Sequence, residues 1–182
     1  MKAKELSRRE FGGMTGAGLF IFFQTGLAQE QEPVRLPGRI QTATDFNAFL
    51  RIGEDGRVTC LVGKVELGQG AMTSLAQVLA EELDVAYDSV DVVMGDTELC
   101  PYNMGTFGSM TTPLLVPVVR RAGAEARAVL LVMAAEKLGA PAERLAVKNG
   151  TVIDPQRAGS QVSYAQLVRG QRIERHLKDV PV

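Results

Sequence analysis

The stretch from Val58 to Leu83 constrains the fold of this chain most strongly, because its periodicity changes at a glycine turn. Residues 58–62 alternate in a β-rich run, which predicts a strand. After Gly68-Gln69-Gly70, apolar residues recur at helical spacing, which predicts a helix. Glycine allows close approach to the backbone, and the first N–H groups of a helix attract anions. The turn therefore predicts either a polyanion site, where Gln69 adds uncharged donors and an acceptor, or only a tight strand-to-helix connection.

A second polar loop, residues 98–112, has similar chemistry. It follows a predicted strand, Val90–Met94, and precedes a predicted helix from Pro113 to Leu138. Thr112 is the expected cap of that helix. Further hydroxyls at a helix N-terminus predict a second anion-binding concavity, so we expect the two loops to share one large ligand held by neutral donors. The hydroxyls and glycines left over after capping are Gly105, Thr106, Gly108, Ser109 and Thr111.

Composition and charge exclude several functions. The net charge of -1 predicts no nucleic-acid surface. The two cysteines match no metal spacing; Cys60 is predicted to be a buried strand residue, and whether it pairs with Cys100 stays open. The single histidine, His176, lies in a predicted polar tail, so the chain offers no triad and no histidine metal site. We predict no catalytic residue and no metal ligand here. The carboxylates near the first turn and its helix are predicted to be solvated: Glu66, Glu81, Glu82 and Asp84.

Residues 1–28 are predicted to be a signal peptide, called the leader below, followed by a linker at 29–44. The segment Ser7-Arg8-Arg9-Glu10-Phe11 is similar to a twin-arginine export signal, and the apolar run Phe11–Phe23 precedes the small residues Gly26-Leu27-Ala28. The alternative is an N-terminal membrane anchor, for which the apolar run is short. The export signal predicts a periplasmic protein, which could still associate with the membrane through partners.

The remainder predicts an α/β fold of the mixed α+β kind, a mixed sheet with β-hairpins and two main helices. A strand at residues 45–52 and the turn Asp55-Gly56 predict one hairpin, and Asn149-Gly150 predicts another. Ser163 is the expected cap of a short helix. We place one domain at residues 45–170 and a tail, or linker to a downstream region, at 171–182.

The two loops resemble those of the xanthine dehydrogenase/aldehyde oxidase family of molybdenum hydroxylases. Glu66-Leu67-Gly68-Gln69-Gly70 resembles the family's E-x-G-Q-G segment, and Thr106-Phe107-Gly108-Ser109-Met110-Thr111 resembles the next. The twin-arginine signal directly before this domain is similar to the isoquinoline 1-oxidoreductase type of large subunit (the beta subunit). The resemblance implies a molybdopterin-cofactor-binding domain whose cofactor ligands are Gly68, Gln69, Gly70, Thr106, Gly108, Ser109 and Thr111.

For the whole enzyme, the resemblance implies an oxidoreductase that inserts water-derived oxygen into N-heteroaromatic compounds or aldehydes. It implies a molybdopterin cofactor in the cytosine dinucleotide form. It also implies a small [2Fe-2S] subunit carrying iron–sulfur clusters and a cytochrome c as electron acceptor. The family's later Phe-Gly segment and glutamate base are not in this sequence. The chain is thus expected to be one part of a molybdenum subunit and inactive alone. The alternative is a stand-alone cofactor-binding module or an inactive fragment, which the sequence following Val182 would distinguish.

Overall fold

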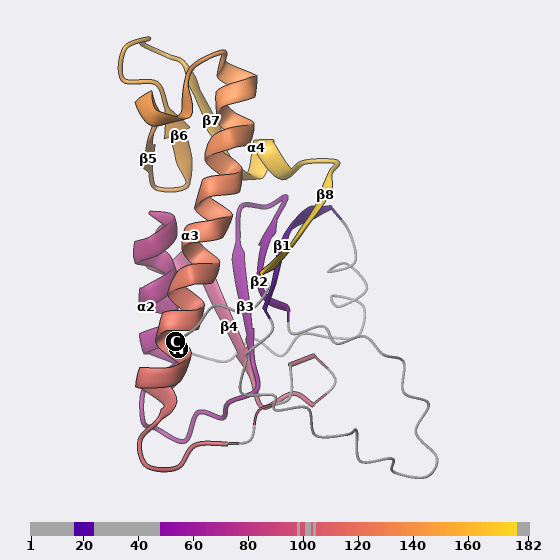
Figure 1. The fold of residues 1–182 in the computed structure, drawn as a ribbon, viewed down its shortest axis with the longest axis vertical. Coiled ribbons are helices and arrows are strands. Elements are labelled where there is room, and N and C mark those ends of the chain that lie inside the picture. Colours follow the sequence, from indigo (N-terminus) through magenta and orange to yellow (C-terminus); the bar gives the residue numbers. More distant parts are fainter. Residues whose placement is uncertain (1–16, 24–47, 98, 101–102, 104, 178–182) are drawn as a thin grey trace.

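The structure is a computed structural model that describes residues 17–23, 48–97, 99–100, 103 and 105–177. A five-stranded sheet has the order β4-β3-β2-β1-β8, and a three-stranded sheet has the order β5-β6-β7 (Figure 1). The prediction of a mixed α/β fold with hairpins and two main helices is confirmed. The strands of the large sheet are β1 (Gly18–Phe23), β2 (Ala48–Gly53), β3 (Val58–Val62), β4 (Val90–Met94) and β8 (Arg172–Leu177).

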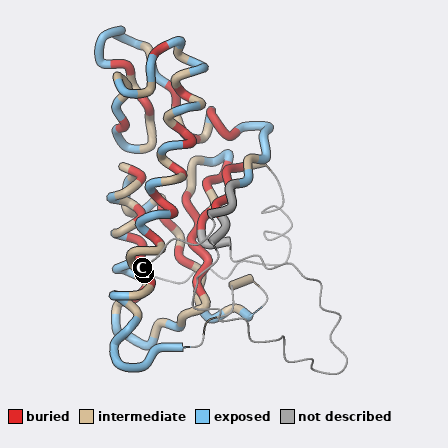
Figure 2. Tube along the Cα trace, in the orientation of Figure 1, coloured by how far each residue is buried: buried red, intermediate tan, exposed pale blue. Residues whose placement is uncertain are grey.

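Two long helices pack side by side on the large sheet, α2 (Ala71–Leu83) and α3 (Thr111–Leu138) (Figure 1). Helix α2 forms because its apolar residues recur at three- and four-residue spacing, and Leu75, Leu79 and Leu83 are buried against the sheet. Figure 2 shows the buried residues gathered between these helices and the strands. All five residues of β3 are buried, including Cys60 as predicted.

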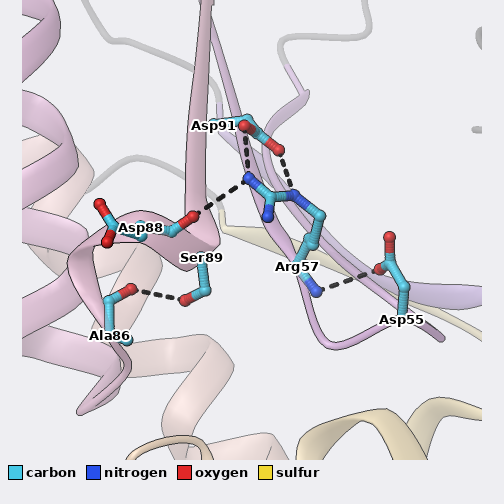
Figure 3. Close-up of polar contacts among 6 residues, drawn as sticks. All are labelled: Asp55, Arg57, Ala86, Asp88, Ser89 and Asp91. Atoms are coloured by element: carbon cyan, nitrogen blue, oxygen red, sulfur yellow. Dashed lines mark hydrogen bonds and ion pairs between the residues drawn. The ribbon is translucent and has the colours of Figure 1, made fainter. Parts of the chain in front are cut away.

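The strand pairing places the ends of β3 and β4 next to each other. Strand β2 pairs with β3 through the predicted hairpin, antiparallel, whereas β3 pairs with β4 in parallel with Val62 opposite Met94. At the other end of this parallel pair, Arg57 holds Asp91 through two bonds of 2.6 Å each, and also donates to the Asp88 carbonyl (Figure 3). The Asp91 hydrogen bond raises the pKa of Arg57. Because loops that leave parallel strands emerge at one edge, the glycine turn and the second polar loop lie together.

The C-terminal part of the domain docks on the end of α2. The small sheet comprises β5 (Ala146–Lys148), β6 (Thr151–Ile153) and β7 (Gln161–Ser163), and the predicted Asn149-Gly150 hairpin joins its first two strands. Ser163 caps α4 (Tyr164–Val168) as predicted. The buried Tyr164 hydroxyl donates to the Leu83 carbonyl at 2.9 Å, and burial raises its pKa to about 12. Two 3₁₀ turns complete the elements, η1 (Tyr87–Ser89) and η2 (Ala142–Arg144).

Two strands lie where the sequence indicated no part of the domain. Strand β1 falls inside the predicted leader, and β8 falls inside the segment predicted to be a tail. They pair with each other in parallel, from Gly18 opposite Arg172 to Phe23 opposite Leu177. Both strands are six residues long, as is β2; the apolar run that contains β1 was assigned to the leader, and the charged segment that contains β8 was assigned to a tail. The linker at 29–44 and the Ser7–Phe11 motif lie outside the described residues, as does the His176 side chain, so those predictions stay predictions.

In the part of the chain that the structure describes, no helix is long and apolar enough to cross a membrane.

Candidate functional site: two loops at the N-terminal ends of α2 and α3

The glycine turn connects β3 to α2 with open space above it. Gly68 and Gly70 have φ of 97° and 79°, and a Cβ built on either would meet nothing within 4 Å. Glycine is thus required here by backbone conformation, since L-residues rarely adopt positive φ, and not by close packing. Gly70 is the residue directly before α2. The space above the turn is what a ligand approaching the backbone needs.

The Glu66 carboxylate accepts hydrogen bonds from the backbone N–H groups that were predicted to bind an external anion. One of its oxygens, Oε1, accepts from the N–H groups of Gly68 at 2.8 Å and Gly70 at 2.9 Å, and Oε2 accepts from Met72 at 2.8 Å. The hydrogen bond from Met72, followed by that from Gly70, lowers the pKa of Glu66. Glu66 was predicted to belong to a solvated helix face; it is partly exposed, but it lies before the helix and accepts three backbone hydrogen bonds, a role that the prediction missed. The sequence did hold a signal for this bonding: a glutamate two residues before the first glycine of a turn has a side chain long enough to reach the N–H groups of the turn.

Gln69 also bonds within the turn. Its side-chain oxygen accepts from the Leu67 N–H at 2.6 Å, and its Nε2 donates to the Val65 carbonyl at 2.8 Å. The residue is exposed. An amide held at both ends has a fixed orientation, so one remaining Nε2 proton and the second lone pair of the oxygen are presented at a defined place.

The second loop brings together two of the predicted hydroxyls. The Oγ1 atoms of Thr106 and Thr111 lie 2.7 Å apart, within a hydrogen bond. Gly108 and Ser109 follow one another in the left-handed region, with φ of 60° and 58°. Consecutive residues of this kind turn neighbouring backbone N–H groups toward one side, as in anion-binding concavities. Thr106, Gly108 and Ser109 are all exposed.

Helix α3 begins two residues earlier than predicted. Its N-cap is Met110, which makes no side-chain cap, so the prediction that Thr112 caps the helix is wrong. Thr112 lies inside the first turn, and Pro117 is accommodated further along. The hydroxyls of this loop are therefore not consumed as caps, and the N-terminal end of α3 differs from that of α2, where Glu66 binds the backbone amides.

A lysine joins the two loops. Lys64, at the start of the glycine turn, donates from Nζ to the Gly105 carbonyl of the second loop, and burial lowers its pKa. Asp96 accepts from the Leu99 N–H at 2.9 Å and so orders the start of that loop. Neither loop has a charged residue at its centre, and Lys64, which lies beside both, was not among the predicted site residues. Figure 2 shows exposed residues dominating both loops at the lower ends of α2 and α3.

The arrangement suits a hydrogen-bonding cradle, in which the charged side chains of Glu66 and Lys64 are already bonded to backbone groups of the two loops. The residues that the resemblance assigned to the cofactor, Gly68, Gln69, Gly70, Thr106, Gly108, Ser109 and Thr111, come from two loops that leave one sheet edge. Among the described residues, no three His, Cys, Asp or Glu side chains gather as a metal-binding group. Cys60 and Cys100 are both free thiols, and burial raises the pKa of Cys60 to about 12, so it is inert as a nucleophile.

Known proteins share this domain. The family described as "Molybdopterin cofactor-binding domain" matches residues 2–180. A nicotinate dehydrogenase subunit of Pseudomonas putida is 44% identical over 131 residues, which are 72% of this chain and 11% of that protein. The beta subunit of isoquinoline 1-oxidoreductase of Brevundimonas diminuta is 35% identical over 138 residues, 72% of this chain and 18% of that one.

Solved structures of molybdenum-containing and related oxidoreductases contain a domain with a similar fold. A reconstituted CO dehydrogenase from Oligotropha carboxidovorans superimposes with a TM-score of 0.58 at 27% identity, covering 65% of this chain and 15% of that chain. Quinoline 2-oxidoreductase from Pseudomonas putida 86 gives a TM-score of 0.56 at 26% identity, with the same coverage. The chain spans between about a tenth and a fifth of the length of these relatives. It is homologous to the catalytic subunits of molybdenum hydroxylases, covers only a part of them, and belongs to the molybdopterin cofactor-binding domain family of the xanthine dehydrogenase/aldehyde oxidase large subunits.

Proposed function

We propose that this chain is the part of a periplasmic molybdenum hydroxylase that orients the pterin cofactor. The complete enzyme would oxidise an N-heteroaromatic compound or an aldehyde with oxygen derived from water. The relatives named for nicotinate, isoquinoline and quinoline support the heteroaromatic class. The single observation that carries the proposal is the convergence of the glycine turn and the hydroxyl-bearing loop at one sheet edge, tied together by Lys64 and Gly105.

The two loops play different parts in this proposal. Because Glu66 already binds the amides of Gly68, Gly70 and Met72, the α2 end faces the cofactor with Gln69 and an open glycine backbone, which suits the uncharged pterin. The loop before α3 offers hydroxyls and the concavity at Gly108-Ser109, which suits the phosphate groups.

The residues of this chain bind and orient, and the bound cofactor supplies the two-electron oxidation. Glu66 holds the glycine turn in one conformation, and Gln69 is held at both ends of its amide, so the turn is organised before the cofactor arrives. Several large apolar side chains on these loops are exposed, and we propose that the remainder of the molybdenum subunit covers them and excludes water from the site. They are Val65, Leu67, Phe107 and Met110.

The proposed partners are the remainder of the molybdenum subunit, a small subunit carrying [2Fe-2S] clusters and a cytochrome c. The proposed cofactor form is the molybdopterin cytosine dinucleotide. Metal and pterin analysis of the complete assembled complex tests this proposal. We expect molybdenum and a pterin dinucleotide in near-equal amounts with the molybdenum subunit; absence of both from the complete complex would overturn it.

Export by the twin-arginine route completes the proposal. The Ser7–Phe11 motif lies outside the described residues, so its support is the sequence alone. Changing Arg8 and Arg9 together to Lys should block transfer to the periplasm, because the export receptor reads the arginine pair. Fractionation of cells that express the complete complex measures this. Periplasmic activity at the wild-type level in the Arg8→Lys/Arg9→Lys variant would count against the signal.

A further inference from the structure

We infer that the space between β2 and β8 is a strand-binding slot. In the precursor it is filled by the leader, and in the exported protein by a strand from the remainder of the molybdenum subunit. The inference rests on the proposed function, which removes residues 1–28 on export. Strand β1 (Gly18–Phe23) lies within that segment, yet it is an interior strand of the large sheet.

The pairing of β1 is extensive on both sides. It runs antiparallel to β2, from Gly18 opposite Gly53 to Phe22 opposite Ala48, with a register shift after Ile21. It runs parallel to β8 over all six of its residues. Removing β1 would therefore separate β8 from the sheet and leave β2 with an unpaired backbone edge, which proteins cover or protect.

Both faces of β1 are specifically filled. On the face toward α3, Leu19 and Ile21 have no exposed surface and belong to the hydrophobic core. On the opposite face, the guanidinium groups of Arg51 and Arg172 lie 5.8 Å and 5.0 Å from the centre of the Phe20 ring. These arginines come from β2 and β8, so an aromatic side chain is bracketed by both neighbouring strands.

These contacts define the chemistry of any occupant. It must be an extended segment with the pattern aliphatic, aromatic, aliphatic, antiparallel to β2 and parallel to β8. Its first residue must also be small, because a Cβ at position 18 would lie 2.8 Å from the Ile52 carbonyl oxygen. If the leader is removed, two fully buried aliphatic positions and one bracketed aromatic position become vacant together. Under the proposed function, this chain is one part of a much longer molybdenum subunit, since it spans 11% and 18% of two relatives, and the remainder of that subunit supplies the replacement strand.

Peptide binding to the full chain tests the slot itself. Leu19→Asp and Ile21→Asp, combined in the full chain, would expel β1. The probe is a fluorescent synthetic peptide with the sequence of residues 16–25 and a solubilising lysine tail. We expect it to bind this variant at least tenfold more tightly than the wild-type chain, whose slot is filled. A matched peptide with Asp at positions 19 and 21 should bind neither. Equal binding of the two peptides to a folded variant would overturn the inference.

The exported complex supplies a second measurement, which decides the matter if the Asp variant does not fold. Mass spectrometry should find the mature N-terminus after residue 23, and hydrogen exchange should find residues 48–53 protected as interior-strand amides. A mature subunit that retains β1 would overturn the inference. So would a leaderless subunit in which the β2 amides that do not bond β3 exchange freely. Molybdenum and pterin content of the same sample reports on the proposed function separately, since a fully loaded complex that retains β1 would refute only the slot.

Discussion

Gly123 on α3 sets the distance between the two helices that carry the cofactor loops, and its replacement by alanine tests this packing. It is buried against α2, and a Cβ built on it would lie 2.7 Å from the Glu82 Cβ and 3.6 Å from the Leu79 Cδ2. Carbon atoms in ordinary contact are about 3.5–4.0 Å apart, so the helices would have to separate by about 1 Å. The atom that obstructs the new methyl group is attached directly to the backbone and cannot swing aside.

Two effects oppose each other in the Gly123→Ala variant. Overpacking of this kind typically costs about 1–3 kcal/mol. Alanine in a helix interior is more stable than glycine by about 0.8–1.0 kcal/mol. Taking about 2 kcal/mol for the overlap, we expect the free energy of unfolding to fall by about 1 kcal/mol. The sign of the change decides the test, because helix propensity alone would raise the free energy of unfolding.

Urea unfolding of the full chain, followed by circular dichroism, measures the difference. Ala124→Gly is the matched control, because Ala124 is the next residue and is exposed, so that it reports the propensity difference alone. The packing cost is the fall in Gly123→Ala plus the fall in Ala124→Gly. If Gly123→Ala is instead stabilised by as much as Ala124→Gly is destabilised, the close helix contact does not constrain the domain. Because a displacement of about 1 Å at a site can matter strongly, the same variant should also retain less cofactor in the complete complex.

Two further predictions concern side chains that each bond to the backbone, Glu66 and Tyr164. The folded-state pKa of Glu66 is lowered. The carboxylate therefore orders the turn fully above its unfolded pKa of about 4.3, and this ordering is lost as the pH falls through the lower folded pKa. The amide NMR shifts of Gly68, Gly70 and Met72 should titrate together below pH about 4.3, and in Glu66→Gln they should not titrate at all. Titration of these amides unchanged in Glu66→Gln would contradict the assignment. Tyr164→Phe leaves the Leu83 carbonyl without its donor and should lower the free energy of unfolding by about 1–3 kcal/mol in urea unfolding, whereas an unchanged value would mean that water replaces the hydroxyl.

The domain's local elements were predictable because each has a local cause. Alternation indicated β3 and β4, the Asp55-Gly56 and Asn149-Gly150 turns indicated the hairpins, and Ser163 indicated the cap of α4. The strands β1 and β8 were not predicted, because the apolar run that contains β1 also fits a leader and β8 shows no alternation of apolar and polar residues; in the structure β1 pairs with both β2 and β8. The apolar run that contains β1 lies between basic residues and a cleavage-like site. Its composition is the same for an export signal as for a strand, so composition could not distinguish the two.

The positions of the candidate site were predictable, whereas their hydrogen bonding was not. Two glycine-bearing loops before helices are recognisable in the sequence, and the structure places them at one sheet edge. Which group binds the backbone amides is decided by side-chain reach, so Glu66 appeared only as another carboxylate. The link from Lys64 to Gly105 joins segments 41 residues apart and depends on the parallel pairing of β3 with β4.

The central claim is that the glycine turn holds the molybdenum cofactor through Gln69. Molybdenum content per purified complete complex, compared between Gln69→Ala and Gln77→Ala, tests it most directly, because Gln77 is exposed on the body of α2 away from the turn. Loss of a matched amide in a dry site costs on the order of 1–3 kcal/mol, so Gln69→Ala should retain roughly tenfold less molybdenum or worse. Gln69→Glu should retain still less, because it adds a negative charge beside an anionic cofactor, and Gln77→Ala should retain the wild-type amount. Full molybdenum occupancy in both Gln69 variants, with the fold intact by circular dichroism, would contradict the claim.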